Sequence, residues 1–206
     1  MKLRLSILTI SVSTLIVPLS AATETHQLVS TPQSANKNST YLNWHNLCLN
    51  ADTDTIDTQI KKFESQIAIH PNDNLAKAYL GSAYALRAKS STWWLTKLKY
   101  LNKGKATMNA AIAAAPNDPR VRMVRAIAYY KVPKRFDLRP TSISDFKQII
   151  PVALKNASPL AINERQAILY YAYLAYEDEN LKGAETFKQA CYKLNSSSKY
   201  GKLTRP

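Results

Sequence analysis

The chain contains few of the residues from which reactive sites are usually built. Its 206 residues include four glycines, two cysteines and three histidines. A loop that cradles phosphate needs several glycines close together, and the sequence also has no C-x-x-C, G-x-S-x-G or H-E-x-x-H motif. The histidines, His26, His45 and His70, are isolated from one another. We therefore predict no catalytic residue, no metal ligand and no cofactor, and we expect a protein that binds rather than an enzyme.

Long apolar runs are also absent. The most apolar segment, residues 5–17, has thirteen residues, whereas a membrane-spanning helix needs about 20. Lys2 and Arg4 precede this segment and small residues follow it, which is typical of a secretory signal peptide over residues 1–22. We predict cleavage near Ala22 and a periplasmic or secreted protein of bacterial type. An uncleaved amino-terminal anchor is the alternative.

Acidic residues are scarce in the middle of the chain. The formal net charge is +14, and between Lys77 and Arg139 fourteen basic residues stand against only Asp118 and Asp137, a local excess of twelve. A basic region of this kind attracts acidic protein surfaces, anionic membrane head groups or acidic envelope polymers. Because an exported protein seldom meets nucleic acid, we do not expect a nucleic-acid partner.

Amphipathic helices are predicted along the chain. Apolar residues recur at intervals of three and four, and no segment shows the alternation of a strand. The tripeptide Pro-Asn-Asp occurs twice, at residues 71–73 and 116–118. Its proline ends one helix, and its polar side chains supply capping oxygens for the next. We therefore predict that each tripeptide is both a helix stop and a helix start.

Four units share one spacing of residues. In each, a small residue in a first helix is followed by a second helix in which an aromatic residue or Met stands four positions after a small or polar one. The units are Trp44-x2-Leu47-Cys48 with Gln59-x3-Phe63, Leu80-Gly81-x2-Tyr84 with Gly104-x3-Met108, Ala126-x2-Tyr129 with Ser142-x3-Phe146, and Tyr171-Ala172-x2-Ala175 with Gly183-x3-Phe187.

This spacing resembles the tetratricopeptide repeat, whose usual length is about 34 residues. The resemblance implies an all-α fold, a tetratricopeptide-like alpha-alpha solenoid of three to four helix pairs over residues 41–195. It also implies that small residues such as Gly81 and Ala126 let the two helices of a pair approach closely. The polar segments on either side, residues 23–40 and 196–206, are predicted to be a flexible lead-in and a flexible basic tail.

The two cysteines, Cys48 and Cys191, fall in the first and last units. Because each pair of a solenoid touches only its neighbours, the two thiols are not expected to meet. We predict that they are small buried helix residues. A disulfide is the alternative in an oxidising compartment.

Two units are longer than the others between their first and second helices. The second has about twelve extra residues and the third about five. Equivalent connections in a stacked array emerge along one edge, so we expect the two inserts to be neighbours. Their aromatic residues either pack inward or remain exposed and dock a partner. The candidate edge residues are Trp93, Trp94, Lys97 and Lys99 in one insert and Lys131, Lys134, Arg135 and Phe136 in the other.

The first helices of the units define a second candidate surface. In proteins that this chain resembles, these helices line a concave groove that grips an extended peptide or a helix. Tyrosines there suit recognition, because they combine contact area with a hydroxyl group, but the same tyrosines can equally pack between helices. The equivalent residues are Ser82, Arg120, Ile127, Tyr130, Lys131, Tyr173 and Tyr176.

These patterns together predict an exported interaction or adaptor module that binds an acidic or extended protein partner. Binding would use the concave face, the basic and aromatic edge, or both. The alternative is peripheral association with an anionic membrane or an envelope polymer through Trp93 and Trp94. The charges expected to contact an acidic partner are Arg120, Arg122, Arg125, Lys131, Lys134 and Arg135.

Overall fold

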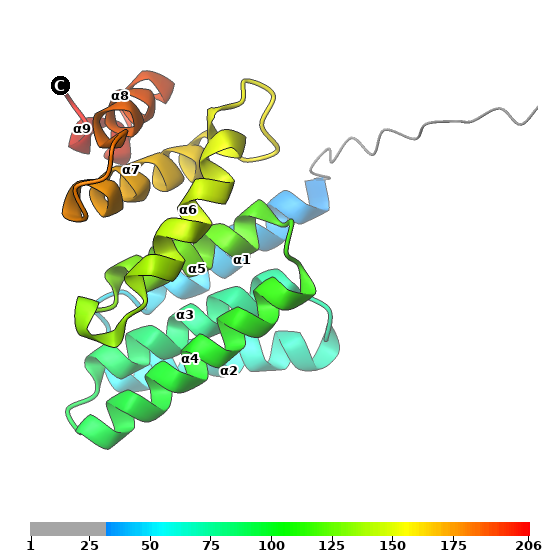
Figure 1. The fold of residues 1–206 in the computed structure, drawn as a ribbon. Helices are drawn as coiled ribbons and strands as arrows, with labels where there is room; N and C mark the ends of the chain where they lie inside the picture. The colour runs from blue at the N-terminus through cyan, green and yellow to red at the C-terminus, as the bar shows by residue number, and fades with distance from the viewer. Residues whose placement is uncertain (1–31) are drawn as a thin grey trace, which may run out of the picture.

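The computed structural model describes residues 32–206, which are all-helical, as the sequence predicts (Figure 1). No strand occurs within this range. The predicted signal peptide at residues 1–22 lies outside the described residues. The helices are α1 (Pro32–Leu47), α2 (Thr53–Ile69), α3 (Asn74–Ser90), α4 (Trp94–Ala114), α5 (Pro119–Lys131), the 3-10 helix η1 (Lys134–Phe136), α6 (Arg139–Leu154), α7 (Ile162–Asp178), α8 (Ala184–Leu194) and α9 (Lys199–Leu203).

The two Pro-Asn-Asp tripeptides separate helices as predicted. The carboxylate of Asp73 accepts a hydrogen bond from the backbone N–H of Ala76 at 2.9 Å and caps α3. Asp118 caps α5 in the same way, accepting from the N–H of Arg120 at 2.8 Å. Each carboxylate satisfies a backbone donor that the first helical turn leaves unpaired.

Consecutive helices pack as pairs through small residues at their crossing points. In the α3–α4 pair, a Cβ atom on Gly104 would lie 2.6 Å from the carbonyl oxygen of Gly81, so the two backbones are in direct contact. In the α5–α6 pair, the Ser142 hydroxyl donates to the carbonyl oxygen of Ala126 at 2.7 Å. Of the four large residues predicted to fill the remaining space, Phe63, Met108 and Phe146 are almost completely buried, and Phe187 is partly buried.

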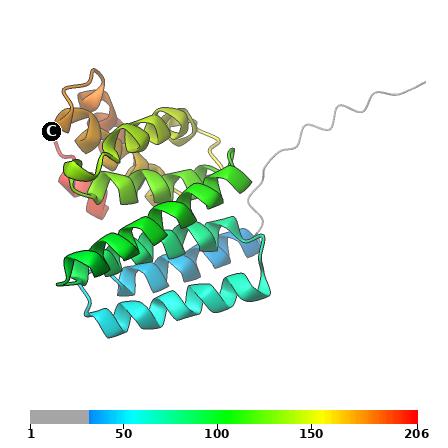
Figure 2. The same ribbon diagram turned by 60° about the horizontal axis from the view of Figure 1, so that its bottom comes forward.

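Helix α5 is the centre of the molecule. Figure 2 shows it between α1–α4 on one side and α6–α9 on the other. Its side chains take part in all three buried hydrophobic clusters, because successive turns of the helix face different neighbours. The α5 residues concerned are Val121 and Val124 in the first cluster, Met123 and Ala126 in the second, and Ala128 and Tyr129 in the third.

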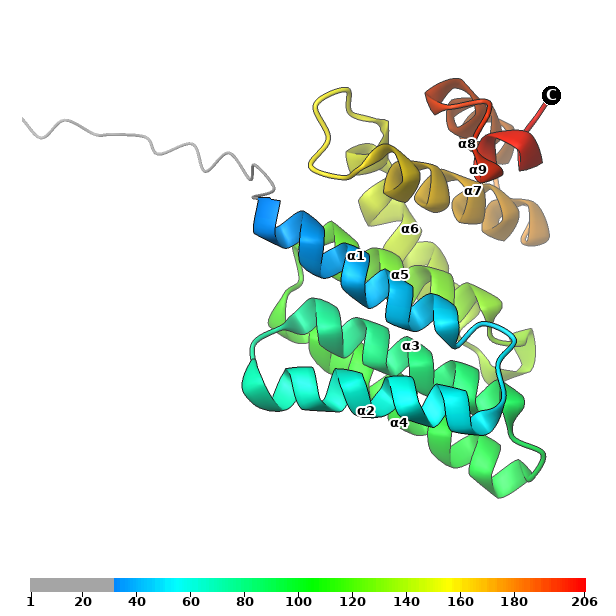
Figure 3. The same ribbon diagram turned by 180° about the vertical axis from the view of Figure 1, so that it is seen from behind.

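Helix α1 runs beside α3 and in front of α5, as Figure 3 shows. Nε2 of His45 is 2.8 Å from the hydroxyl of Ser82 on α3. The amide of Asn38 donates to a carboxylate oxygen of Glu164 on α7 at 3.0 Å. The first helix therefore reaches the fourth helix pair.

Both segments predicted to be flexible are helical over part of their length. Helix α1 begins at Pro32, inside the predicted lead-in of residues 23–40, and it is held there by the contacts of Asn38. In the predicted tail, residues 196–206, α9 is capped by Ser198, and both Gly201 and Thr204 are buried. Polar composition did not indicate these helices, because contacts made over long distances in sequence do not show in composition.

Candidate docking surface

The extra residues of the second unit lengthen its helices and form almost no loop. Helix α3 has 17 residues and α4 has 21, and only residues 91–93 separate them. Close contact between Gly81 and Gly104 keeps the two helices together along this length. The turn between them projects beyond the α1–α2 turn (Figure 3). The sequence predicted an insert at this place, but the insert is mostly helical.

The apex of this helical hairpin exposes three consecutive apolar residues. Trp93 is 79% exposed, Trp94 54% and Leu95 78%. About two turns further along α4 the side chains point inward: Leu101 is buried, and the Tyr100 ring lies 6.1 Å from that of Tyr84. Of the two arrangements that the sequence allows for the tryptophans, the structure has the exposed one.

The two inserts meet, as predicted. The rings of Trp94 and Phe136 are stacked, with centroids 6.2 Å apart and planes inclined by 19°. Phe136 belongs to η1, which connects α5 to α6. We call the surface formed by Trp93, Trp94, Leu95 and Phe136 the aromatic tip.

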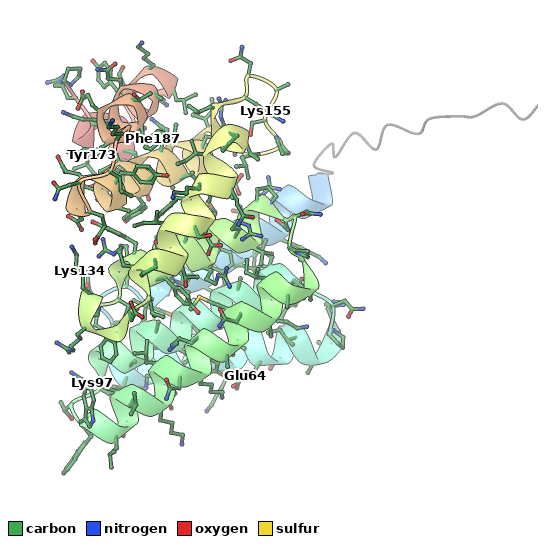
Figure 4. All side chains as sticks on the ribbon, viewed as in Figure 1. Glu64, Lys97, Lys134, Lys155, Tyr173 and Phe187 are labelled. Atoms are coloured by element: carbon green, nitrogen blue, oxygen red, sulfur yellow. The ribbon has the colours of Figure 1, made fainter. Side chains whose placement is uncertain are left out.

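Unpaired cations surround the aromatic tip. Of the fourteen basic residues between Lys77 and Arg139, seven form ion pairs within the described part of the chain. Figure 4 shows Lys97 and Lys134 on the same side of the molecule, away from Lys155. Lys134 is paired with Glu179 at 2.9 Å. Four basic residues close to the tip in sequence have no ion pair with a described residue: Lys89, Lys97, Lys99 and Arg135. Lys131 points elsewhere, with its ammonium group 4.9 Å from the ring of Tyr171.

Three arginines that were predicted to bind a partner form ion pairs within the fold. Nε of Arg120 donates to Glu164 at 2.7 Å, and the side chains of Arg122 and Arg125 both donate to Asp145, at 2.7 and 2.8 Å. Asp145 is 1% exposed and Arg122 8%. These guanidinium groups neutralise buried carboxylates, so they are not free charges for an acidic partner. Their part in binding a partner stays a prediction, and the structure shows them engaged within the fold.

The tyrosines predicted to line a groove make internal contacts. Tyr130 donates to Asp178 at 3.2 Å, and the Arg139 guanidinium lies 4.2 Å above its ring. Tyr176 is buried and packs edge-on against Phe187, with ring centroids 5.0 Å apart. Tyr173, which is half-buried, donates to Glu177 at 3.2 Å. The structure therefore favours the packing role that the sequence left as the equal alternative.

Helix α1 occupies space in front of α3 and α5, where a groove ligand was expected. His45, on α1, faces Ser82 and is close enough to Lys131 to be affected by its charge. Burial lowers the pKa of His45 to about 4, and the Lys131 charge adds to the effect. His45 is therefore neutral at physiological pH, and its ring packs 5.6 Å from that of Tyr79.

A depression of about 650 Å³ lies on the edge opposite the aromatic tip, where the turns containing Pro71 and Asp118 come together. Its charged lining residues are already engaged, because Arg120 pairs with Glu164 and Lys37 lies 4.0 Å from Asp73. This hollow was not predicted from the sequence. The repeated Pro-Asn-Asp was the available signal, because equivalent turns of stacked pairs lie side by side.

No group of three potential metal-ligating side chains occurs among residues 32–206. The two cysteines, Cys48 and Cys191, are buried and unpaired, as predicted for small core residues. Within the described range, no helix is both long and apolar enough to cross a membrane. No protein-family model, curated protein or solved structure matches the chain.

Proposed function

We propose that the protein is an exported binding module that docks an acidic partner on its aromatic tip. The single observation that carries this proposal is the consecutive exposure of Trp93, Trp94 and Leu95 beside unpaired cations. Large apolar side chains are usually covered in soluble proteins, and an exposed group of them marks an interaction site. The export part of the proposal rests on the leader-like sequence of residues 1–22.

We further infer that the helix pairs form a tetratricopeptide-like solenoid. Two pairs support this inference, because residues at equivalent places in the sequence pattern touch at equivalent places in the structure. These are Gly81 with Gly104 and Ala126 with Ser142. Such a scaffold holds a docking surface rigidly, since each helix is fixed by its neighbours.

An extended peptide along the concave face has less support than docking at the tip. Helix α1 already contacts Ser82 and Glu164 there. The arginines and most of the tyrosines that were candidates for that face have partners within the fold. We therefore place the proposed binding site at the edge of the molecule, on the aromatic tip.

Binding to immobilised poly-glutamate tests the proposal, because this probe supplies acidic side chains without a lipid phase. We expect retention at low salt and release as the ionic strength rises, since exposed charges are screened beyond about 10 Å at 0.1 M salt. Replacement of Lys97 and Lys99 by Gln should weaken retention by about threefold to tenfold.

The matched control replaces Lys61 and Lys62, two exposed lysines of α2, by Gln. This variant loses the same formal charge at a place remote from the tip. Equal weakening in both variants, or no retention of the unmodified protein, contradicts docking of an acidic partner at the tip.

A further inference from the structure

The aromatic tip is convex and stands at an extreme of the molecule. It is formed by Trp93 in the α3–α4 turn, the first residues of α4 and Phe136 of η1. The α3–α4 turn projects past the neighbouring α1–α2 turn (Figure 3). A protein partner would have to offer a pocket shaped to receive two indole rings. A lipid surface needs no such pocket, because head groups and acyl chains rearrange around an inserted side chain.

The chemistry of the tip matches the interfacial layer of a bilayer. Tryptophan concentrates at that layer, because its ring is largely apolar while its N–H group requires a polar partner. Trp93 and Trp94 are followed directly by Leu95, whose side chain is 78% exposed and has no polar atom. The three residues therefore place two amphipathic rings and one fully apolar side chain next to one another on the surface.

The cations are placed where they can reach lipid phosphates while the rings insert. Lys97 and Lys99 follow the apolar residues within the first two turns of α4, and Arg135 adjoins Phe136. A lysine buries its methylene chain along an apolar surface and keeps its ammonium group at the polar boundary. Each unpaired cation near an anionic leaflet strengthens the association.

Carboxylates at this edge weaken the positive field only in part. Asp57 is paired with Arg87 at 2.8 Å, and Asp178 is paired with Arg139 at 2.9 Å. Asp52 caps α2 and Asp54 lies in its first turn, next to the α1–α2 turn, which is set back from the tip (Figure 3). Residues 89–100 contain no acidic residue, whereas the exposed carboxylate of Asp137 directly follows Phe136 of the tip.

We propose that the aromatic tip inserts into the interface of an anionic phospholipid bilayer, so that the protein is a peripheral membrane protein. This inference rests on the proposed function, and it names the acidic partner as a lipid surface. The module would then lie against the leaflet with α3 and α4 directed toward it. The depression on the opposite edge would face away.

Vesicle co-sedimentation tests this proposal with two compositions, phosphatidylcholine alone and phosphatidylcholine with about 30% phosphatidylglycerol. The protein used is residues 23–206, so that the apolar leader makes no contribution. We expect binding to the anionic vesicles that is at least about tenfold tighter than binding to the neutral ones. The triple replacement Trp93→Ser, Trp94→Ser and Leu95→Ser should weaken this binding by about tenfold or more, because it removes the inserting surface.

The matched control is Ile69→Ser with Leu203→Ser, which removes two exposed apolar residues outside the tip. Its vesicle binding should be unchanged. A second measurement uses Trp44→Phe, which leaves Trp93 and Trp94 as the only fluorophores of their kind. Brominated lipids should quench this emission, and circular dichroism of every variant checks that the helices remain folded.

The outcomes separate the two proposals. Failure to bind anionic vesicles, or binding that the triple replacement leaves intact, overturns the lipid proposal. If poly-glutamate is retained through the tip while vesicles are not bound, the partner is an acidic macromolecule and the proposed function stands. If neither probe binds, both proposals are wrong.

Discussion

The carbonyl oxygen of Gly81 lies 2.6 Å from the position that a Cβ atom on Gly104 would occupy, so α3 and α4 cross with no side chain between them. This contact makes the α3–α4 hairpin a stiff support for the aromatic tip. In a helix without such a neighbour, replacing Gly by Ala stabilises by about 1 kcal/mol.

At the α3–α4 crossing we expect the replacement of Gly by Ala to destabilise the fold instead. Gly104→Ala forces the two backbones apart, so we expect the free energy of unfolding to fall by about 1–3 kcal/mol. Urea denaturation followed by circular dichroism measures the change. Asn102→Ala, at an exposed position of the same helix, is the control and should change stability by no more than about 0.5 kcal/mol. Stabilisation by Gly104→Ala would show that the helices are not in direct contact.

Asp145 forms ion pairs with two guanidinium groups, those of Arg122 and Arg125. Asp145→Asn keeps the shape of the side chain but leaves two cations in a site that is almost closed to water. We expect a loss of about 3–5 kcal/mol in the free energy of unfolding, because a buried charge without its partner is strongly unfavourable. The measurement is again urea denaturation.

Asp178→Asn provides the contrast. Asp178 pairs with Arg139, but its side chain is 43% exposed, so this substitution should cost less than about 1 kcal/mol. Equally small losses for Asp145→Asn and Asp178→Asn would mean that the Asp145 cluster is hydrated.

His45 should make the protein sensitive to mild acid. Burial lowers its pKa in the fold to about 4 from an ordinary value of 6.5. Below pH 6.5 the unfolded chain therefore binds a proton that the folded chain does not, so stability falls as the pH drops from 6.5 toward 4. Between pH 7.5 and 4.5 this group should account for a loss of at most about 2–3 kcal/mol.

The measurement compares the pH dependence of unfolding for the unmodified protein and His45→Gln, because carboxylates common to both cancel. The free energy of unfolding of the variant should fall less steeply as the pH drops. Parallel curves for the two proteins would show that His45 is solvated, with a pKa near its ordinary value.

The carboxyl-terminal helix should protect Cys191. Thr204 is fully buried, and its side chain lies within hydrogen-bonding reach of the Cys191 thiol. Burial raises the pKa of that thiol. Deletion of residues 196–206 should therefore speed its reaction with a thiol reagent by about tenfold or more, through exposure and through a larger thiolate fraction. Mass spectrometry of the labelled peptides distinguishes Cys191 from Cys48.

Cys48 is the internal reference and should stay unreactive in both proteins, because α9 does not cover it. Deletion of Arg205 and Pro206 alone should change neither rate. Rapid labelling of Cys191 in the full chain would contradict its burial beneath the carboxyl-terminal segment.

Features set by local sequence could be predicted. Asp73 and Asp118 cap helices because each stands directly before a helical segment. Gly81 and Ala126 mark helix crossings because the spacing of small and large residues recurs. The meeting of the two inserts followed from the same repetition, and the Trp94–Phe136 stacking confirms it.

Features set by distant partners could not be predicted. Arg120 and Glu164 are 44 residues apart, and Arg122 and Asp145 are 23 apart. Composition counts such charges but does not reveal which of them meet. The part of α1 before Tyr41 was not predicted for a related reason, since Asn38 contacts Tyr79 of α3 and Glu164 of α7 through polar atoms.

The hydrogen bond from Asn38 to Glu164 joins residues 126 positions apart and connects the first helix pair to the fourth. In an open row of helix pairs, either end can fray while the remainder stays folded. Here Glu164 also holds Arg120, so one carboxylate fastens α1, α5 and α7 together. Because these contacts join the two ends of the helical array, we expect both ends to unfold in a single cooperative step.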